Sequence, residues 1–348
     1  MADRADTAPA QQPQGPSNGS VLTRALAVLV RLMRSKMVRV AFLVAVLVLL
    51  ALVLYDEAGT LWHEVQRLSW PVLVLAFVLG LLGLCCNLMV WREMLADLGT
   101  RLSIPEAWRI YFIGGLSKYI PGSIWPVLAQ AELGADRGIP RSRSAMSVIV
   151  CYAVMACSGV VIAAITLPFA SAGSVVQYFW ILLLIPIGVA ALSPPILNRL
   201  LRFVLRLAHQ DQGQMSVSYR GLARTMAWAV ASWIFNGLVI YVLLRRLAGV
   251  HQGTLLISMG AYSLSWAVGL VTPTPAGAGT REAVMIAVLH TQTTAGIALA
   301  VALVSRALSV VADAATGAAA SALVGRRRLR QLRAARRYGG GGSGPADS

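Results

Sequence analysis

The chain has 348 residues, of which 57% are hydrophobic and only 13% are charged. A soluble domain cannot bury that much apolar surface, so the composition excludes a soluble protein and predicts an all-α polytopic membrane protein. The formal net charge of +16 gives no reason to expect a nucleic-acid partner, because the basic residues lie mostly between apolar runs and in the two tails.

The chain divides into a tail, one membrane domain and a second tail. Residues 1–23 are rich in Pro, Gln, Ser and Ala and are predicted to be disordered. A single transmembrane domain is expected over 24–325, with halves at about 38–168 and 175–323. Residues 326–348 are basic and then glycine-rich, and they predict a cytoplasmic tail attracted to anionic lipids.

Six apolar runs are long enough to cross about 30 Å of hydrocarbon as helices. They are approximately residues 38–55, 71–91, 145–168, 175–197, 222–244 and 294–323. Two further runs, about 110–134 and about 254–290, are each interrupted by proline and glycine. The first has about ten residues on each side of its break, which is half the depth of a membrane at about 1.5 Å per residue. We therefore expect two re-entrant hairpins, each returning to the side from which it entered.

Six full spans and two hairpins put both ends of the chain on one side of the membrane. Most basic residues then fall on that side, which the positive-inside rule identifies as the cytoplasm. They are the N-terminal basic segment, Arg92, Arg101, Arg109, Arg137, Arg141, Arg143, Arg199, Arg202, Arg206, Arg220, Arg224 and the tail from Arg326 to Arg337. The basic residues opposite are Arg67, Arg245 and Arg246. The predicted location is the bacterial inner (plasma) membrane, with several passes and both termini cytoplasmic.

The arm at about 254–271 could instead be counted as a full span. That count would send the arginine-rich tail outside, which the positive-inside rule disfavours. With two hairpins, the first enters from the cytoplasm and the second from outside, so the two halves form an inverted repeat. Interrupted helices at corresponding places in two halves are the best sequence pointer to a transport site.

The two breaks supply the candidate site. The first is Lys118-Tyr119-Ile120-Pro121-Gly122-Ser123, and the second is Pro275-Ala276-Gly277-Ala278-Gly279-Thr280-Arg281-Glu282. Helices that restart at about Ser123 and Thr280 would present unpaired N–H groups to the membrane interior, where anions are the natural ligands. The same two hydroxyls could instead serve as N-caps.

Lys118 and Arg281 are costly to place in a membrane unless something negative meets them. We expect them to attract an anionic head group. Arg281 could instead form an internal ion pair with Glu282 or Asp313, and Lys118 could extend to the interface. The predicted binding residues are Lys118, Tyr119, Pro121, Gly122, Ser123, Pro275, Gly277, Gly279, Thr280, Arg281 and Glu282, with Arg306 and Asp313 in support.

Three further patterns concern helix packing. Arg306 and Asp313 are seven residues apart, so they share one helix face that points into the bundle. Their role could be substrate binding, proton coupling or packing. Asn87 and Asn236 are expected to link helices by hydrogen bonds. Ser103-Ile104-Pro105-Glu106 has the pattern of a capping box.

Nothing in the sequence predicts a metal, a cofactor or a catalytic residue. Cys85, Cys86, Cys151 and Cys157 lie in apolar runs and fit small core residues better than a disulfide or zinc pattern. The four histidines are far apart and away from acidic clusters.

The two breaks together carry a resemblance to a known family. Gly115-Leu116-Ser117-Lys118-Tyr119-Ile120-Pro121-Gly122-Ser123-Ile124-Trp125 and Pro275-Ala276-Gly277-Ala278-Gly279-Thr280-Arg281-Glu282-Ala283 resemble the lysylphosphatidylglycerol synthase transmembrane family of flippase-like proteins. The chain departs from the family's Pro-Gly-Gly-x-Gly-x-Arg-Glu-like motif by having Ala276 and Ala278 in place of one usual glycine and a neighbouring residue. The resemblance implies a domain that moves a charged lipid between leaflets. The 25 residues after 323 cannot hold a soluble synthase domain, so synthase activity is not expected.

We therefore expect a lipid flippase, not an enzyme. Its partners would be membrane lipids and an anionic lipid or a polyprenyl-phosphate-linked glycolipid as cargo. The first alternative is an integral-membrane transferase acting on a lipid-linked sugar, for which Asp56-Glu57 offers a weak acidic pair. The second is a non-transporting partner of a cell-envelope biosynthetic enzyme. The sequence does not indicate an oligomeric state.

Overall fold

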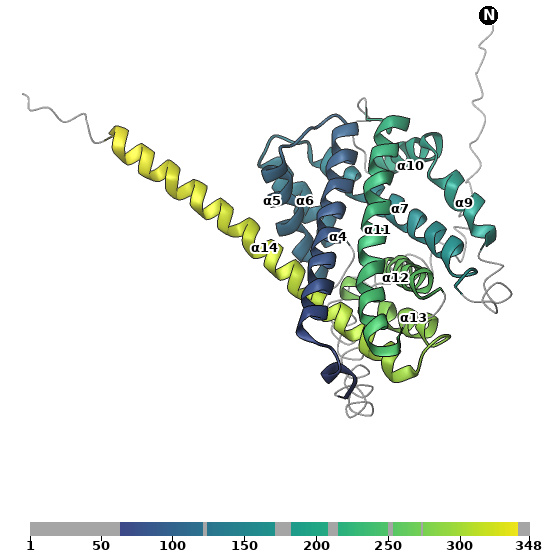
Figure 1. Cartoon of the computed structure of the whole chain (residues 1–348). Helices are drawn as coiled ribbons and strands as arrows, with labels where there is room; N and C mark the ends of the chain where they lie inside the picture. The colour runs from purple at the N-terminus through teal and green to yellow at the C-terminus, as the bar shows by residue number, and fades with distance from the viewer. Residues whose placement is uncertain are drawn as a thin grey trace, which may run out of the picture. The chain divides into compact units, whose positions relative to one another are not determined.

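The computed structural model describes residues 63–120, 124–170, 182–207, 215–249, 253–272 and 274–339, with side chains described as far as Ala322. All of them lie in one compact unit, 46–348. The regular elements within these ranges are all helical (Figure 1), in agreement with the predicted all-α class. They are α4 (Trp70–Asp97), α5 (Ile104–Gly115), η1 (Leu116–Tyr119), α6 (Trp125–Ala135), α7 (Arg141–Thr166), α9 (Leu184–Ala191), α10 (Pro194–Leu207), α11 (Tyr219–Ala248), α12 (Thr254–Val271), η3 (Pro275–Gly277), α13 (Thr280–Leu289) and α14 (Ala295–Gly339).

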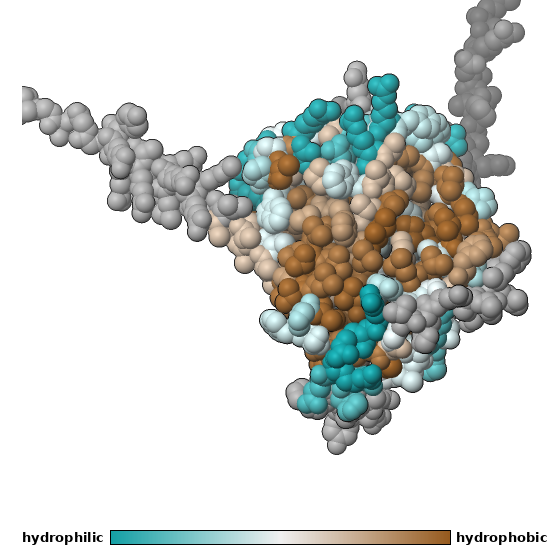
Figure 2. All heavy atoms as spheres, in the orientation of Figure 1, coloured by the Kyte–Doolittle hydropathy of each residue, from teal (hydrophilic) through white to brown (hydrophobic). Residues whose placement is uncertain are grey.

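Five of the described helices are long and apolar enough to cross a membrane: α4, α7, α11, α12 and the Ala295–Ala322 part of α14. Figure 2 shows a broad apolar band between two polar ends of the face drawn. Exposed Val74, Leu75, Val78 and Leu82 on α4 contribute apolar surface of the kind that lipid requires. The protein is a multi-pass membrane protein.

Four of these helices match the predicted runs at 71–91, 145–168, 222–244 and 294–323. The fifth, α12, is the arm at 254–271 that we assigned to a hairpin, and by length and composition it could also cross alone. The two re-entrant hairpins and the inverted repeat therefore stay predictions. The tail at 1–23 and the predicted span at 38–55 lie outside the described residues.

The predicted span at 175–197 is wrong at its C-terminal end. Helix α9 stops at Ala191, and a separate helix, α10, begins at Pro194. The Pro194-Pro195 pair explains the break, because proline disfavours helix at the preceding residue but fits a first helical turn. In α10, Leu197, Leu201 and Leu205 face the core. Its arginines at 199, 202 and 206 are exposed, as in helices that lie in a membrane interface.

The most extensive helix contact in the described part is between α4 and α11, which run in opposite directions (Figure 1). At one end the Ser218 hydroxyl donates to Asp97 at 2.6 Å. Near the middle the Ser232 hydroxyl donates to Asn87 at 2.8 Å. This bond confirms the predicted interhelical role of Asn87.

Asn236 packs at the same contact but bonds differently from the prediction. Its side-chain amide donates to the Ser232 carbonyl of its own helix at 2.9 Å. A Cβ at Gly83 would overlap the Asn236 side chain. Glycine at this position therefore lets the two helices approach, as small residues do between membrane helices.

Helices α5 and α6 pack against each other on either side of the first break. Gly114 makes this possible, since a Cβ there would lie 2.6 Å from Gln130 Cγ and 3.3 Å from its backbone nitrogen. The predicted capping box forms at the start of α5, where the Ser103 backbone N–H donates to the Glu106 carboxylate at 3.3 Å. Helix α6 begins at Trp125, so the start predicted at Ser123 is two residues early.

Candidate functional site

The two breaks lie beside each other in space, because η1 contacts both η3 and α14. Of the predicted first-break residues, Lys118 and Tyr119 belong to η1. Pro121, Gly122 and Ser123 lie outside the described residues. The site is therefore built from the C-terminal end of the α5 arm, the second break and α14.

Three of four consecutive residues in the second break have unusual backbone conformations. Ala276, Gly277 and Gly279 have φ angles of +50°, +72° and +84°. Glycine adopts positive φ readily, whereas alanine is strained there. Ala276 is the non-glycine residue with positive φ among those described, and it stands at one of the two places where the chain departs from the resembled motif.

Thr280 is the first residue of α13, and Gly279 precedes it as the flanking residue, so the predicted N-cap role of Thr280 is wrong. The Thr280 hydroxyl instead donates to the Gly277 carbonyl at 3.1 Å and lies 2.9 Å from the Thr272 hydroxyl. Glu282 accepts from the Gly279 N–H at 2.7 Å. A carboxylate in the first turn stabilises the N-terminus of α13.

Arg281 reaches the interior through a slot made by two glycines. A Cβ at Gly269 would overlap Arg281 Cγ, and a Cβ at Gly277 would lie 2.9 Å from both Cγ and Cδ. The guanidinium carbon lies 5.5 Å from the centre of the Tyr262 ring, in a cation–π arrangement. The side chain is therefore held by packing along its stem.

Helix α14 determines the partners of the two acids that could have met Arg281. Arg306 Nε lies 3.4 Å from Glu282 Oε1, and its Nη2 donates to the Ala276 carbonyl at 3.0 Å. Asp313 pairs with Lys118 Nζ at 2.6 Å. The alternative that Arg281 pairs with Glu282 or Asp313 is therefore wrong. Among the described residues, Arg281 has no carboxylate partner.

Asp313 binds both described polar side chains of the first break, Lys118 and Tyr119. Lys118 Nζ and the Tyr119 hydroxyl both approach Asp313 Oδ2 at 2.6 Å. The Lys118 side chain is 36% exposed and that of Asp313 only 10%. Lys118 thus turns inward to an acid, and the alternative that it extends to the interface is wrong.

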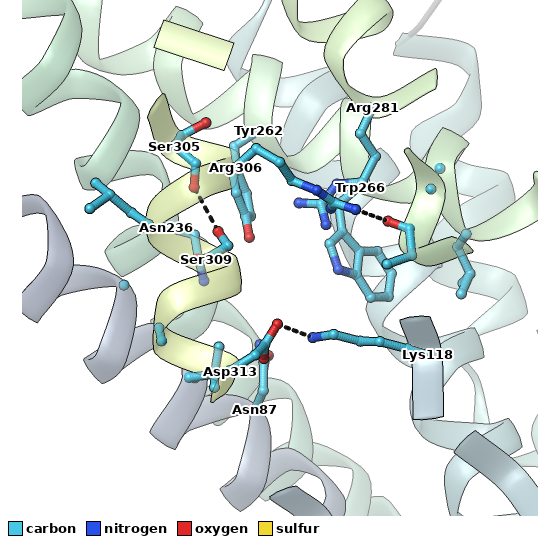
Figure 3. Close-up of a pocket in the computed structure, with 18 of the residues that line it drawn as sticks. Asn87, Lys118, Asn236, Tyr262, Trp266, Arg281, Ser305, Arg306, Ser309 and Asp313 are labelled. Carbon is cyan, nitrogen blue, oxygen red and sulfur yellow. Dashed lines mark hydrogen bonds and ion pairs between the residues drawn. The ribbon is translucent and has the colours of Figure 1, made fainter. Parts of the chain in front are cut away.

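These groups line one cavity of about 160 Å³ between α4, α12, α14 and the two breaks. Figure 3 shows Arg306, Arg281 and Trp266 on one side of the space and the Lys118–Asp313 pair on the other. A volume of this size holds on the order of ten water molecules. Three cationic side chains, Lys118, Arg281 and Arg306, and one acidic side chain, Asp313, line the cavity.

A smaller cavity adjoins it, where Glu282 meets Arg281 and Arg306. Counting Glu282, the site has three cations against two carboxylates, and both carboxylates are held in ion pairs. One positive charge is left over at Arg281. Chemically, the arrangement can accept an anion through the planar guanidinium fork, which matches phosphate or carboxylate oxygens.

Residues 38–317 match the family described as the lysylphosphatidylglycerol synthase TM region. The chain belongs to this family. No curated protein matches the sequence. The matched range includes both breaks, Arg306 and Asp313. Membership of the lysylphosphatidylglycerol synthase TM region family makes the chain a membrane protein related to lipid handling.

Six of the predicted residues line the main cavity: Lys118, Tyr119, Gly277, Arg281, Arg306 and Asp313. Glu282 lines the smaller one. Pro275, Gly279 and Thr280 shape the second break without lining either cavity. Sequence reasoning missed the aromatic residues Tyr152, Tyr262 and Trp266. The available signal was the Tyr262 and Trp266 pair, four residues apart and therefore on one face of α12.

Proposed function

We propose that this member of the lysylphosphatidylglycerol synthase TM region family is a flippase that moves an anionic lipid between the leaflets of the bacterial inner membrane. The observation that carries the proposal is Arg281, a cation at an interior cavity with no carboxylate partner among the described residues. A charge in such a place is costly unless a ligand meets it. The phosphate of a lipid head group would meet it.

In this mechanism the head group enters the cavity and its phosphate oxygens accept hydrogen bonds from the Arg281 guanidinium. Lys118 and Arg306 line the same cavity and add positive potential. The acyl or prenyl chains stay in the lipid. Alternating access would come from one half of the domain moving against the other, with the site near the middle.

We propose transport as the role of the cavity because Glu282 and Asp313 are both held by cations at 3.4 and 2.6 Å. Acid–base catalysis needs a carboxylate free to exchange a proton with a substrate. We also propose that both termini are cytoplasmic, because the exposed Arg199, Arg202 and Arg206 on α10 and Arg224 near the start of α11 belong to the basic segments that the positive-inside rule assigns to that side.

The test is translocation of a fluorescent phosphatidylglycerol in proteoliposomes, measured by the fraction that an external quencher can reach over time. Arg281→Gln should lower the rate about 10- to 100-fold, because a charge-assisted hydrogen bond contributes about 1.5–3 kcal/mol. Arg281→Lys should retain part of the activity, since it keeps the charge but loses the fork.

Arg224→Gln is the matched control, because it removes an exposed arginine of α11 that lies away from the cavity. It should translocate at the rate of the unmodified protein. Equal rates for Arg281→Gln, Arg224→Gln and the unmodified protein would contradict the proposal.

A further inference from the structure

We infer that the cavity selects lipids whose phosphate carries a neutral, hydroxylated ring, and that it rejects lipids with a cationic aminoacyl head group. The inference rests on the proposed function, because it names the head-group class bound at the same site. Three features of the cavity carry it: its charge, its hydrogen-bonding groups and its aromatic wall.

The charge of the cavity disfavours a cation. Lys118 and Arg306 are each paired with a carboxylate, and Arg281 is the cation left over. A head-group ammonium placed about 4 Å from Arg281 would be repelled by about 4 kcal/mol at an effective dielectric constant of about 20. The two carboxylates that could offset this repulsion are already engaged.

Three of the hydrogen-bonding groups that line the cavity have no acceptor among the described residues. They are the Arg281 guanidinium, the Trp266 indole N–H and the Tyr262 hydroxyl. An ammonium group has three donors and no acceptor, so it would leave the Arg281 guanidinium and the Trp266 N–H without a partner. Phosphate oxygens accept from them, and ring hydroxyls can both accept and donate.

The aromatic wall is formed by Tyr152 of α7 with Tyr262 and Trp266 of α12. Trp266 makes an edge-to-face contact with Tyr152, with ring centres 6.5 Å apart. It makes a second edge-to-face contact with Trp233, with ring centres 5.5 Å apart. In Figure 3, Trp266 lies between the two arginines and Lys118. An aromatic face carries partial negative charge and attracts the C–H groups of a sugar or inositol ring.

An aromatic cage for a quaternary ammonium is the competing interpretation. The position of Arg281 argues against it, since its guanidinium already lies 5.5 Å from the Tyr262 ring centre. The protein's own cation thus takes the cation–π position. Trp266 and Tyr152 remain to pack against a neutral ring, next to a guanidinium that binds its phosphate.

The experiment compares binding of three lipids with identical acyl chains to the purified full chain, by native mass spectrometry in one detergent. Phosphatidylinositol carries a neutral hydroxylated ring, phosphatidylglycerol a small anionic head group, and lysylphosphatidylglycerol a cationic one. Phosphatidylinositol should bind at least tenfold more tightly than lysylphosphatidylglycerol and about threefold more tightly than phosphatidylglycerol.

Trp266→Leu should remove the preference for phosphatidylinositol over phosphatidylglycerol and leave phosphatidylglycerol binding unchanged. Trp266→Phe keeps a ring face and should keep the preference, which guards against a simple folding defect. Trp228→Leu is the control, because Trp228 is an exposed tryptophan of α11 away from the cavity.

Two results would overturn the inference: lysylphosphatidylglycerol binding as tightly as phosphatidylinositol, or an unchanged lipid ratio in a folded Trp266→Leu protein. If either is found while Arg281→Gln still loses anionic lipid, the head-group inference fails and the flippase proposal stands. If Arg281→Gln binds and translocates lipid like the unmodified protein, the flippase proposal itself fails.

Discussion

The two helix breaks look alike in sequence but treat their cations in opposite ways. At the first break, Lys118 Nζ forms an ion pair with Asp313 Oδ2 at 2.6 Å, and the Tyr119 hydroxyl donates to the same oxygen. At the second, Arg281 is held along its stem by Gly269 and Gly277, and no described carboxylate meets its charge. The charge of one break is therefore neutralised within the protein, and the other break keeps an unpaired positive charge among the described residues.

Helix α14 causes the difference. It brings an acid, Asp313, to the first break and a base, Arg306, to the second. Because Arg306 takes Glu282, the acid adjacent in sequence to Arg281 is not available to it. The contrast teaches that a spare charge can be created by adding a cation as well as by removing an acid.

The largest expected effect comes from breaking the neutralised pair. Asp313→Asn should lower the free energy of unfolding by about 2–3 kcal/mol, below the range of about 3–5 kcal/mol for fully buried pairs, because Lys118 is 36% exposed. Denaturant titration in detergent measures it. The double variant Lys118→Met, Asp313→Leu should recover much of the loss, since it leaves no unpaired charge. A double variant as unstable as the sum of its single changes would contradict an ion-pair role.

The second-largest effect is expected from filling the slot that Gly269 and Gly277 leave for the Arg281 side chain. Gly269→Ala places a Cβ on the Arg281 stem, so it should lower the free energy of unfolding by about 1–3 kcal/mol, as overpacking does. Binding of phosphatidylglycerol should fall as well, because the guanidinium is displaced. Gly115→Ala is the control, since nothing lies within 4 Å of a Cβ there, and it should lower neither quantity. Similar losses for the two variants would argue against the slot.

The smallest effect concerns backbone strain at the second break. Ala276→Gly should raise the free energy of unfolding by about 0.5 kcal/mol or less, because relief of the positive φ outweighs the added entropy of glycine in the unfolded chain. Ala278 has a φ of −59°, where alanine is unstrained. Ala278→Gly should therefore lower stability by about 0.5–1 kcal/mol. Thermal unfolding distinguishes the two by the sign of the change, and equal signs would contradict the strain.

The sequence was a good guide to which residues meet at the breaks but a poor guide to how they pair. The seven-residue spacing of Arg306 and Asp313 predicted a shared face, and both line the cavity. The spacing carries no information about which break each one reaches, so from the sequence we considered Arg281 as the partner of Glu282 or Asp313 and missed Arg306 and Lys118. Helix register against a distant loop decides that choice, and local pattern does not encode it.

The fold shows the same limit. Hydropathy located α4, α7, α11 and the apolar part of α14, because a lipid-facing helix must be apolar along its length. It misplaced the end of the span near residue 191, where the prolines at 194 and 195 start a helix with an apolar inner face. The aromatic wall escaped prediction because Tyr152 and Trp266 come from helices more than a hundred residues apart in sequence.

Helix α14 has a mechanical consequence. Arg306 and Asp313 are seven residues apart, about 10 Å along the axis at about 1.5 Å per residue, and each is anchored to a different break. The helical segment between them is stiff. A head group that drew Lys118 away from Asp313 would free one of the two anchors of this segment. Any rotation or translation of the segment that followed would move Arg306, and with it the hydrogen bond to the Ala276 carbonyl.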